Sequence, residues 1–570
     1  MVAVFLMANA TLATAQGNAT VNESTKITTS SAEQLFIHTN ATTFLTGETL
    51  HCKVYCIDPA TKIPGAVSKI AYIELIDSDK KTILNQKINL ENGTGQADFF
   101  IPATLKTGNF KLIGYTQWIL EKSSAGIFTM DLLIINPFQL LPETSIDKNT
   151  GSENTLTENQ EKPVISNLMT VQTDKKTYIN REKVVLKLKS SETAKGNYSL
   201  SIRKIDALPV NTTVHATTLI SETSNLKKPS VTILPELRGE LLSGSIVGKN
   251  GEKNISNKSV ALSIPGKSFA FKIVKTNASG KFIFVLDDNP DASEVVLQVM
   301  EEDRDNYNII IDAPKKPELS AITFLPEVKL NPGLKNAIEQ RSVANQVENA
   351  YYERKKDSTS AVAKTASFYD STQKTYALDD YTRFPTLKET ITEVILEMYT
   401  KTSKGKQSIH LRNNTMDPEV YGLPLILVDG LLIQDSNELY DYNTENIDKV
   451  DLINEPYIFG PKTFSGIANF ITKNTDYETK AAGDYFKKVS VQRPSAKKIY
   501  FNPDYTQPKQ NSRIPDYRQQ LLWMPAINMQ QNEQAISFFT SDISGKYEVV
   551  LEGFTDKGSA VFAKEIFEVK

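Results

Sequence analysis

The residue types that most often carry out catalysis are few and scattered in this sequence. Four histidines occur among 570 residues, each in a different local context: His38, His51, His215 and His410. The sequence contains no His-Glu-x-x-His pattern of a zinc hydrolase, no Gly-x-Ser-x-Gly of a serine hydrolase and no glycine-rich phosphate loop. Adjacent acidic residues such as Asp379-Asp380 are typical of solvated surface. We therefore expect no catalytic, cofactor-binding or metal-binding residues, and a protein that is not an enzyme.

The two cysteines, Cys52 and Cys56, could form a disulfide, bind a metal or pack in a core. Residues 48–57 alternate between two sets of side chains, which predicts a β-strand with both thiols on its core side and His51, Lys53 and Tyr55 on the opposite face. Four residues along a strand separate Cα atoms by ~13 Å, beyond the ~7 Å limit for a disulfide. A metal site would need further His or Cys ligands nearby. We therefore predict two buried, unpaired thiols.

Composition limits the class of protein. Hydrophobic residues make up 40% and charged residues 23% of the chain, values typical of globular domains, and 570 residues suggest several domains. A formal net charge of -3 gives no electrostatic reason to bind nucleic acid or an anionic membrane. After the first residues, no apolar run approaches the ~20 residues of a membrane-spanning helix. We expect no transmembrane segment.

The first fifteen residues have the features of a secretory signal peptide. A short apolar run over residues 1–7 is followed by Ala13-Thr14-Ala15, a small-residue cleavage pattern. The alternative is a buried first strand, which the absence of basic residues before the apolar run would favour. We expect residues 1–15 to be a signal peptide and the protein to be exported.

Short alternating strands separated by glycine-containing turns predict an antiparallel β-sandwich over residues 32–138. The segments Phe-Leu-Thr-Gly-Glu-Thr-Leu and Leu-Lys-Thr-Gly-Asn-Phe-Lys-Leu within it resemble the MG2 domain of the α2-macroglobulin family. A second macroglobulin-like sandwich is expected over residues 165–235, after a polar linker at residues 140–162. The Gly-Cys-Gly-Glu-Gln thioester of protease-trapping macroglobulins is absent, so the resemblance does not imply trapping chemistry.

Three further segments are expected downstream. Residues 236–315 resemble a carboxypeptidase regulatory-like sandwich in their alternation of glycine turns and strands. Residues 331–375 read as a helix capped by Asn331-Pro332 and then a polar linker. Residues 490–570 read as a separate C-terminal sandwich, again macroglobulin-like.

Residues 383–476 combine a helix signal with strand and turn signals. Thr386 and Glu389 form a capping box before an apolar helix face. Val428-Asp429-Gly430 predicts a tight reversal after a buried strand. With the strand at residues 447–453 and the segment at residues 466–473, this order resembles the plug domain of TonB-dependent outer-membrane receptors. A receptor's plug is followed by a barrel of several hundred residues, and fewer than a hundred remain here, so we expect a plug-like domain without its own barrel.

The expected fold class is mainly β and multidomain, with macroglobulin/Ig-like β-sandwiches plus one α+β plug-like domain. The resemblances imply a Gram-negative bacterial protein associated with the outer membrane, on its periplasmic or cell-surface side. Its expected function is that of a non-catalytic accessory subunit of an outer-membrane β-barrel transport, secretion or assembly complex. The alternative is a free-standing cell-surface binding or adhesion protein.

Aromatic residues in two loops of the plug-like domain are candidates for contact with a partner, because tyrosine is enriched in interface cores. The partner would be an outer-membrane β-barrel protein or one of its associated subunits. The alternative is that the rings pack within the domain itself. The candidate residues are Tyr440, Tyr442, Tyr457, Phe459 and Phe464.

Overall fold

The computed structural model describes residues 32–65, 67–122, 126–139, 164–219, 236–286, 293–326, 330–360, 368–369, 374–403, 406–412, 418–506 and 513–570. The predicted signal peptide (1–15) and linker (140–162) lie outside these ranges.

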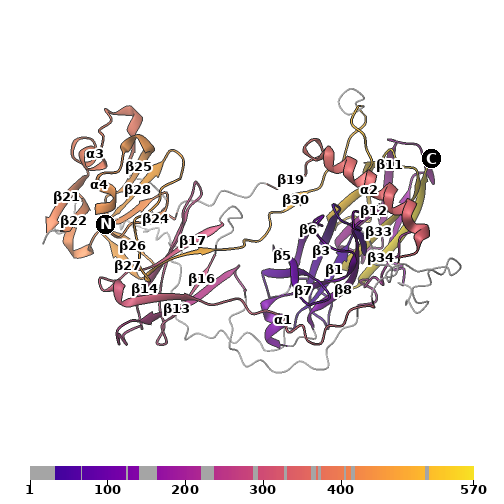
Figure 1. The fold of residues 1–570 in the computed structure, drawn as a ribbon, viewed down its shortest axis with the longest axis horizontal. Coiled ribbons are helices and arrows are strands. Elements are labelled where there is room, and N and C mark those ends of the chain that lie inside the picture. Colours follow the sequence, from indigo (N-terminus) through magenta and orange to yellow (C-terminus); the bar gives the residue numbers. More distant parts are fainter. Residues whose placement is uncertain are drawn as a thin grey trace, which may run out of the picture. The chain divides into compact units, whose positions relative to one another are not determined.

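The chain divides into two compact units, and both consist mainly of β-sheet, as predicted (Figure 1). Among the described residues, unit 1 contains residues 241–313 and 363–491, and unit 2 contains the remainder. The chain passes between the units after residues 240, 313, 362 and 491, so unit 1 consists of two insertions into unit 2.

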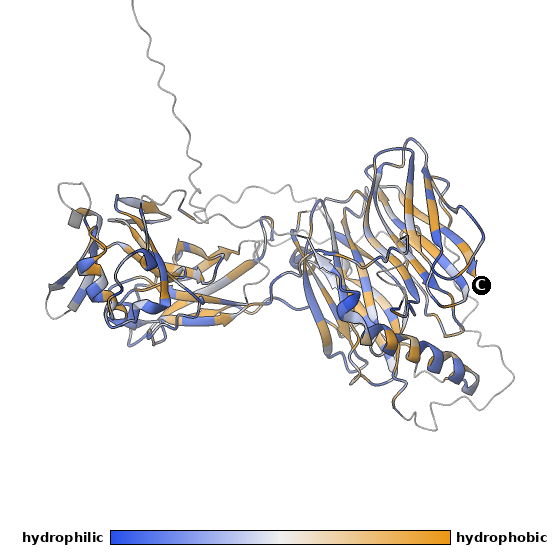
Figure 2. Cartoon of the chain, turned by 90° about the horizontal axis from the view of Figure 1, so that it is seen from above, coloured by the Kyte–Doolittle hydropathy of each residue, from blue (hydrophilic) through white to orange (hydrophobic). Residues whose placement is uncertain are grey.

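The N-terminal sandwich of unit 2 lies within the predicted range 32–138. Its two sheets have the strand orders β1-β3-β6 and β2-β8-β7-β4-β5. Hydrophobic and hydrophilic residues alternate along many of the strands (Figure 2). The elements are β1 (Gln34–Thr39), β2 (Thr43–Leu45), β3 (Thr49–Ile57), β4 (Ile70–Ile76), β5 (Thr82–Asn89), β6 (Thr94–Phe100), β7 (Gly108–Tyr115), α1 (Gln117–Lys122) and β8 (Phe128–Ile135).

The second sandwich of unit 2 is assembled from two distant parts of the chain, and we call it the bipartite sandwich. Its sheets have the orders β10-β34-β33-β12-β31 and β32-β11-β9. The first part supplies β9 (Met169–Thr173), β10 (Thr177–Tyr178), β11 (Lys183–Ser190) and β12 (Gly196–Lys204). The second part supplies β31 (Gln520–Met529), β32 (Glu533–Phe539), β33 (Gly545–Thr555) and β34 (Ala560–Val569).

The prediction of two separate sandwiches at residues 165–235 and 490–570 is therefore wrong. Strand β12 pairs with β31 on one side and with β33 on the other, and β11 pairs with β32. The local alternation of each segment correctly predicts strands. The pattern does not specify the partner of a strand, because the same apolar face fits several neighbours.

Both faces of β3 are buried, which corrects the prediction of a single core face. Cys52 and Cys56 are fully buried on the inner side, as predicted, and are unpaired. The opposite side packs against the bipartite sandwich, where Lys53 is 3% exposed and the Tyr55 hydroxyl donates to the Glu552 carbonyl at 3.1 Å. In Figure 1 the indigo and purple strands lie beside the yellow strands β33 and β34.

The predicted helix after residue 331 is present in unit 2. The Asn331 side chain accepts a hydrogen bond from the Gly333 amide and caps a short 3-10 turn, η4 (Pro332–Leu334). Helix α2 (Lys335–Ala350) follows and buries Arg341. The Arg341 guanidinium donates from Nε to Glu48 Oε1 and from Nη2 to Glu48 Oε2, both at 2.7 Å. Next come the 3-10 turn η5 (Tyr352–Arg354) and strand β19 (Ser358–Thr359), which pairs with β30 (Lys498–Ile499).

Unit 1 begins with the central sandwich, at the position of the predicted sandwich 236–315. Its sheets have the orders β16-β13-β18 and β15-β14-β17-β29, so one strand comes from beyond the predicted range. The elements are β13 (Leu241–Gly248), β14 (Ser259–Ile264), β15 (Ala270–Lys275), β16 (Lys281–Val285), β17 (Glu294–Val299), η3 (Arg304–Asn306), β18 (Tyr307–Ile311) and β29 (Phe486–Ser490).

The remainder of unit 1 is an α+β module whose sheet has the order β20-β25-β28-β23-β24, and only the β23–β28 pair of this sheet is parallel. Two hairpins, β21–β22 and β26–β27, extend from it. Its strands are β20 (Lys374–Ala377), β21 (Met398–Ser403), β22 (Lys406–Leu411), β23 (Leu425–Val428), β24 (Leu431–Leu432), β25 (Ile447–Ile453), β26 (Tyr457–Phe459), β27 (Lys462–Phe464) and β28 (Ile467–Thr472). Its helices are η6 (Leu378–Asp380), α3 (Leu387–Glu393), η7 (Pro418–Tyr421), α4 (Asn437–Tyr440) and η8 (Thr444–Asn446).

Within the described residues, no helix is both long and apolar enough to cross a membrane.

Candidate protein-binding site

The Asp429-Gly430 turn forms as predicted and connects β23 to β24. Both residues have positive φ, +50° and +82°, as a two-residue hairpin turn requires. The buried Asp429 carboxylate accepts hydrogen bonds from the Thr472 amide at 2.8 Å and from the Thr472 hydroxyl at 2.6 Å. Burial raises the pKa of Asp429, and the bonds from Thr472 oppose that shift. The turn is thereby fastened to the end of β28.

The same turn packs against the central sandwich of unit 1. The Gly430 backbone lies so close to Phe269 that a Cβ placed there would be 2.3 Å from the Phe269 Cβ. The Gly266 amide donates to the Asp429 carbonyl at 3.1 Å. Next to it, the Leu432 amide donates to Ser263 Oγ at 3.1 Å. The turn that identified this module in the sequence is therefore an internal contact of unit 1.

One face of the module's sheet is covered by an aromatic and aliphatic cluster shared with the central sandwich. Phe459 of the β26–β27 hairpin stacks on Phe271 with ring centroids 5.7 Å apart and lies 4.7 Å from Phe368. The cluster is formed by Ala261, Phe269, Phe271, Ile273, Met300, Phe368, Tyr369, Leu425, Leu427, Leu432, Ile453, Tyr457, Phe459, Phe464 and Ile467. Helices α3 and α4 contribute to a second apolar cluster on the module's sheet.

The five predicted contact residues all take part in packing within unit 1. Tyr457 and Phe459 are half-buried in the shared cluster, and Phe464 is 7% exposed there. Tyr440 is 5% exposed, and burial raises its pKa to about 12. Tyr442 is half-buried and meets Tyr477 edge-on at 5.4 Å. The rings thus fill the module's own cores, the alternative left open by the sequence, and their role toward a partner stays a prediction.

Four exposed aliphatic side chains of this module are not among the five predicted contact residues. We call them the exposed apolar set: Leu396 (67% exposed), Val420 (71%), Leu423 (54%) and Ile458 (77%). Strand alternation would have identified Ile458, because it lies between Tyr457 and Phe459, which face inward.

The exposed apolar set surrounds one end of the module's sheet. Strands β23 and β28 begin at this end and β25 ends there, since Leu425 and Ile453 are both in register with Ile467. Leu396 belongs to the same end, because its carbonyl accepts a bond from Arg412 Nε at 2.9 Å, and the Arg412 carbonyl accepts one from the Asn454 amide group at 3.3 Å. The loops that carry the set therefore lie at this end of the sheet.

A serine-histidine pair lies within unit 2 but is closed to solvent. His38 Nδ1 is 2.7 Å from Ser199 Oγ, and both residues are buried between the two sandwiches. Burial lowers the pKa of His38. Ser199 also bonds the Tyr55 hydroxyl at 3.1 Å. With no exposed nucleophile, this arrangement works as a polar connection between sandwiches.

Metal-binding chemistry has no counterpart in the described part of the chain, where no three His, Cys, Asp or Glu residues form a metal-binding group. His51 is stacked on Trp523 with ring centroids 5.8 Å apart, and burial lowers its pKa to about 4. His215 Nδ1 lies 2.7 Å from Glu552 Oε1, and His410 Nε2 lies 2.8 Å from Ser408 Oγ.

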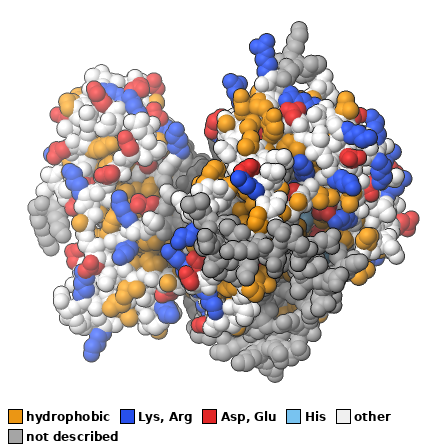
Figure 3. Space-filling model, turned by 45° about the vertical axis from the view of Figure 1, so that its right-hand side comes forward, with side chains coloured by type: hydrophobic (Ala, Val, Ile, Leu, Met, Phe, Trp, Pro, Cys, Tyr) orange, Lys and Arg blue, Asp and Glu red, His pale blue; other side chains and the backbone are white. Residues whose placement is uncertain are grey.

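Figure 3 shows basic and acidic side chains interspersed on the visible face.

Comparisons with known proteins give distant similarity. No protein-family model and no curated protein matches the sequence. Solved structures of α2-macroglobulin from Salmonella, reacted with methylamine, and from Escherichia coli, activated by porcine elastase, each align over 94% of this chain with a TM-score of 0.23, at 10% and 12% identity. The alignments cover 39% and 43% of those chains, so this chain spans about two fifths of their length.

A structure of dimeric latent PorU from Porphyromonas gingivalis aligns over 50% of this chain and 33% of its own, with 10% identity and a TM-score of 0.15.

Proposed function

We propose that this protein is a non-catalytic accessory subunit of an outer-membrane β-barrel complex for transport, secretion or assembly. The observation that carries the proposal is the exposed apolar set at one end of the α+β module. Large exposed apolar patches on a folded protein mark interaction sites more often than isolated apolar residues do. The module is also the part of the chain whose turn and strand order resemble a receptor plug.

The packing inside unit 1 supports partner binding by the exposed apolar set. Tyr457 and Phe459 anchor the β26–β27 hairpin on the central sandwich, so that Ile458 is presented outward from a fixed strand. A side chain held in this way loses little conformational freedom on binding, which favours affinity. One face of the module's sheet is occupied by the central sandwich, and helices α3 and α4 contribute to the second cluster on the sheet. A partner would therefore meet the end of the sheet rather than a face.

The outer-membrane partner is inferred from the resemblance of residues 383–476 to plug domains and from the expected export of the chain. A β-barrel protein, or a subunit associated with it, is the partner class. Ser199 has no accessible surface at which a substrate could react, so we assign the serine-histidine pair a structural role.

The test is purification of the tagged protein from membranes of its own host in mild detergent. Wild-type protein is expected to bring a β-barrel protein with it. The double substitution Leu423→Asp and Ile458→Asp should reduce that recovery at least tenfold, since it places charges in the apolar contact. Ile499→Asp is the matched control, because Ile499 is 65% exposed in unit 2 and should leave recovery unchanged.

Full recovery with the double variant would overturn the proposed contact. Wild-type protein that is monomeric and free of membranes in its host would overturn the accessory-subunit function. Surface-exposed protein with no barrel partner would instead favour a free-standing binding or adhesion protein.

A further inference from the structure

A segment of the chain lies across the outer face of the N-terminal sandwich without joining its sheet. We call residues 314–326 the strap. It has neither helix nor strand and contains three prolines, Pro314, Pro317 and Pro326. Leu319, Ile322 and Phe324 are its half-buried apolar side chains, and most other strap residues are exposed. The strap connects residue 313, the end of a unit 1 segment, to the region that leads into α2.

The surface under the strap, here the strap face, is the outer side of β4 and β7. Tyr72 is in register with Tyr115, and Glu74 with Ile113. Because side chains alternate along a strand, Tyr72, Glu74 and Ile76 share this side. The Tyr72 and Tyr115 rings stack with centroids 5.3 Å apart, and Ile76 and Ile113 are fully buried. The face is therefore apolar enough to require a cover.

The strap face holds the strap mainly by its backbone. Lys80 Nζ donates to the Ser320 carbonyl at 2.8 Å. The Asn109 side-chain amide donates to the carbonyls of Leu325 and Pro326 at 3.2 and 2.6 Å. At the other end, the Gln117 side-chain amide donates to the Lys315 carbonyl at 3.1 Å. These bonds run from side chains of the face to backbone carbonyls of the strap. The strap's own Lys315 side chain also donates to Glu121 Oε1 at 2.7 Å and to the Leu120 carbonyl at 3.1 Å, so the face selects one basic position as well as three apolar positions.

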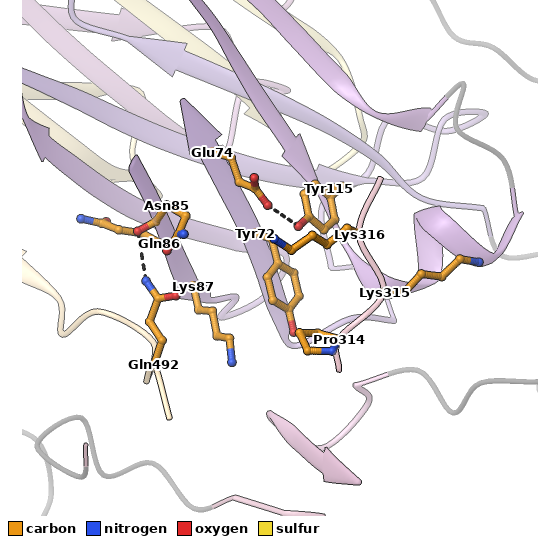
Figure 4. Close-up of a pocket in the computed structure, with 10 residues that line it drawn as sticks. All are labelled: Tyr72, Glu74, Asn85, Gln86, Lys87, Tyr115, Pro314, Lys315, Lys316 and Gln492. Atoms are coloured by element: carbon orange, nitrogen blue, oxygen red, sulfur yellow. Dashed lines mark hydrogen bonds between the residues drawn. The ribbon is translucent and has the colours of Figure 1, made fainter. Parts of the chain in front are cut away.

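The first part of the strap covers a gap rather than a packed contact. A cavity of about 100 Å³ lies between Tyr72, Glu74 and Tyr115 of the sheet and strap residues 314–316, with Gln492 at its side. Figure 4 shows Glu74 directed toward the Tyr115 hydroxyl, to which it is bonded at 2.6 Å. Strap residues 314–316 are exposed on their outer side. This end therefore contributes little apolar packing to hold the strap.

We propose that the strap is an exchangeable occupant of a peptide-binding face, and that an extended peptide of another polypeptide, with apolar residues at the spacing of Leu319, Ile322 and Phe324, binds there when the strap is released. This proposal goes beyond the proposed function, because it concerns unit 2 and does not depend on the exposed apolar set of unit 1. The tethered strap competes at an effective concentration of about 1 mM, which normally keeps the face covered.

The test uses the full chain and a labelled synthetic peptide of residues 314–326. The double substitution Ile322→Asp and Phe324→Asp should release the strap, because it removes two of its three apolar contacts, and it alters no residue of the strap face. In fluorescence anisotropy, this variant should bind the wild-type peptide at least tenfold more tightly than the wild-type protein does. A peptide with the same two aspartates should not bind, and adding Asn109→Ala to the released variant should weaken binding severalfold.

Circular dichroism and thermal unfolding verify that the variants are folded. If the double variant does not fold, Phe324→Ala removes one half-buried ring and should increase peptide binding at least threefold over wild type. A released variant that does not bind the peptide, or a wild-type protein that binds it equally well, would overturn the proposal.

Discussion

Gly430 shows how one residue can decide whether two parts of unit 1 fit together. Its φ of +82° already disfavours other residues, and Phe269 occupies the space where a Cβ would lie. We expect Gly430→Ala to lower the free energy of unfolding of unit 1 by about 2 kcal/mol, through backbone strain and overpacking together. Hydrogen exchange of the amides in β25 and β28 measures the change.

Gly422 provides the matched control for that substitution. Its φ is +76°, and nothing lies within 4 Å of a Cβ built there. Gly422→Ala should therefore lower the free energy of unfolding of unit 1 only by the cost of positive φ, about 1 kcal/mol. Equal effects of the two substitutions would show that the Phe269 contact adds nothing.

Glu48 is the residue whose ionisation should connect the stability of unit 2 to pH. Burial alone would raise the pKa of its carboxyl, but the charge and hydrogen bonds of Arg341, with the charge of Arg203, lower it below the ordinary value of 4.5. A lowered pKa in the folded state means that the stabilisation is fully present above pH 4.5 and is lost as the pH falls through the folded-state pKa.

Glu48→Gln should therefore destabilise unit 2 by about 3 kcal/mol at pH 7, because it leaves Arg341 buried with less compensation. The difference from wild type should shrink as the pH falls below 4.5. Urea unfolding followed by tryptophan fluorescence reports unit 2, since both tryptophans, Trp118 and Trp523, lie there. Glu339→Gln, at a surface pair with Lys335, should change stability by less than about 0.5 kcal/mol. A difference that does not vary with pH would contradict the assignment.

The two thiols should be inert in the folded protein. Burial raises the pKa of Cys52 and of Cys56, so that neither forms the reactive thiolate near neutral pH. We expect no alkylation by iodoacetamide in native buffer at pH 8 and two alkylated cysteines after unfolding, both read by mass spectrometry. Cys52→Ala should lower stability by about 1 kcal/mol, because it removes packing alone. Rapid native labelling would contradict the packing described for β3.

At the scale of elements, α3 begins where the sequence indicates. Thr386 accepts from the Glu389 amide and the Glu389 carboxylate accepts from the Thr386 amide, which completes the predicted capping box. Thr386→Ala should lower the stability of unit 1 by about 1 kcal/mol, measured by hydrogen exchange in α3 and β25. Thr392→Ala, at an exposed site within the same helix, should have no destabilising effect. Similar losses at both sites would show that the cap is not the cause.

The alternation of side chains along a strand predicts the strand but not what packs against each of its faces. The alternation of residues 48–57 predicts β3 and places both cysteines correctly. It does not predict that Tyr55 is buried on the other side, because a tyrosine on a polar face is equally consistent with solvent or with a second sandwich. Tyr457 and Phe459 illustrate the same point, since their aromatic character indicates a contact but not whether the contact is internal.

At the scale of the whole molecule, the bipartite sandwich makes residues 169–204 and residues 520–569 depend on each other. Strand β12 would lose its partners β31 and β33 if residues 492–570 were removed. We expect a chain ending at residue 491 to lose protease resistance over residues 165–204, and co-expression of residues 492–570 to restore it. Limited proteolysis with mass spectrometry distinguishes the outcomes. A truncated chain in which residues 165–204 stay resistant would contradict the shared sheet.

The sequence by itself determined the features that depend on residues close together in the chain. The strand at β3, the Asp429-Gly430 turn and the Thr386 cap each follow from local backbone preferences and hydrogen bonds. Only the tertiary structure decided that β12 pairs with β31 and β33, that the central sandwich covers the module's sheet, and that Ile458 faces outward. The physical reason is that apolar burial is non-directional, so the choice among several compatible partners is made by the packing of the whole unit.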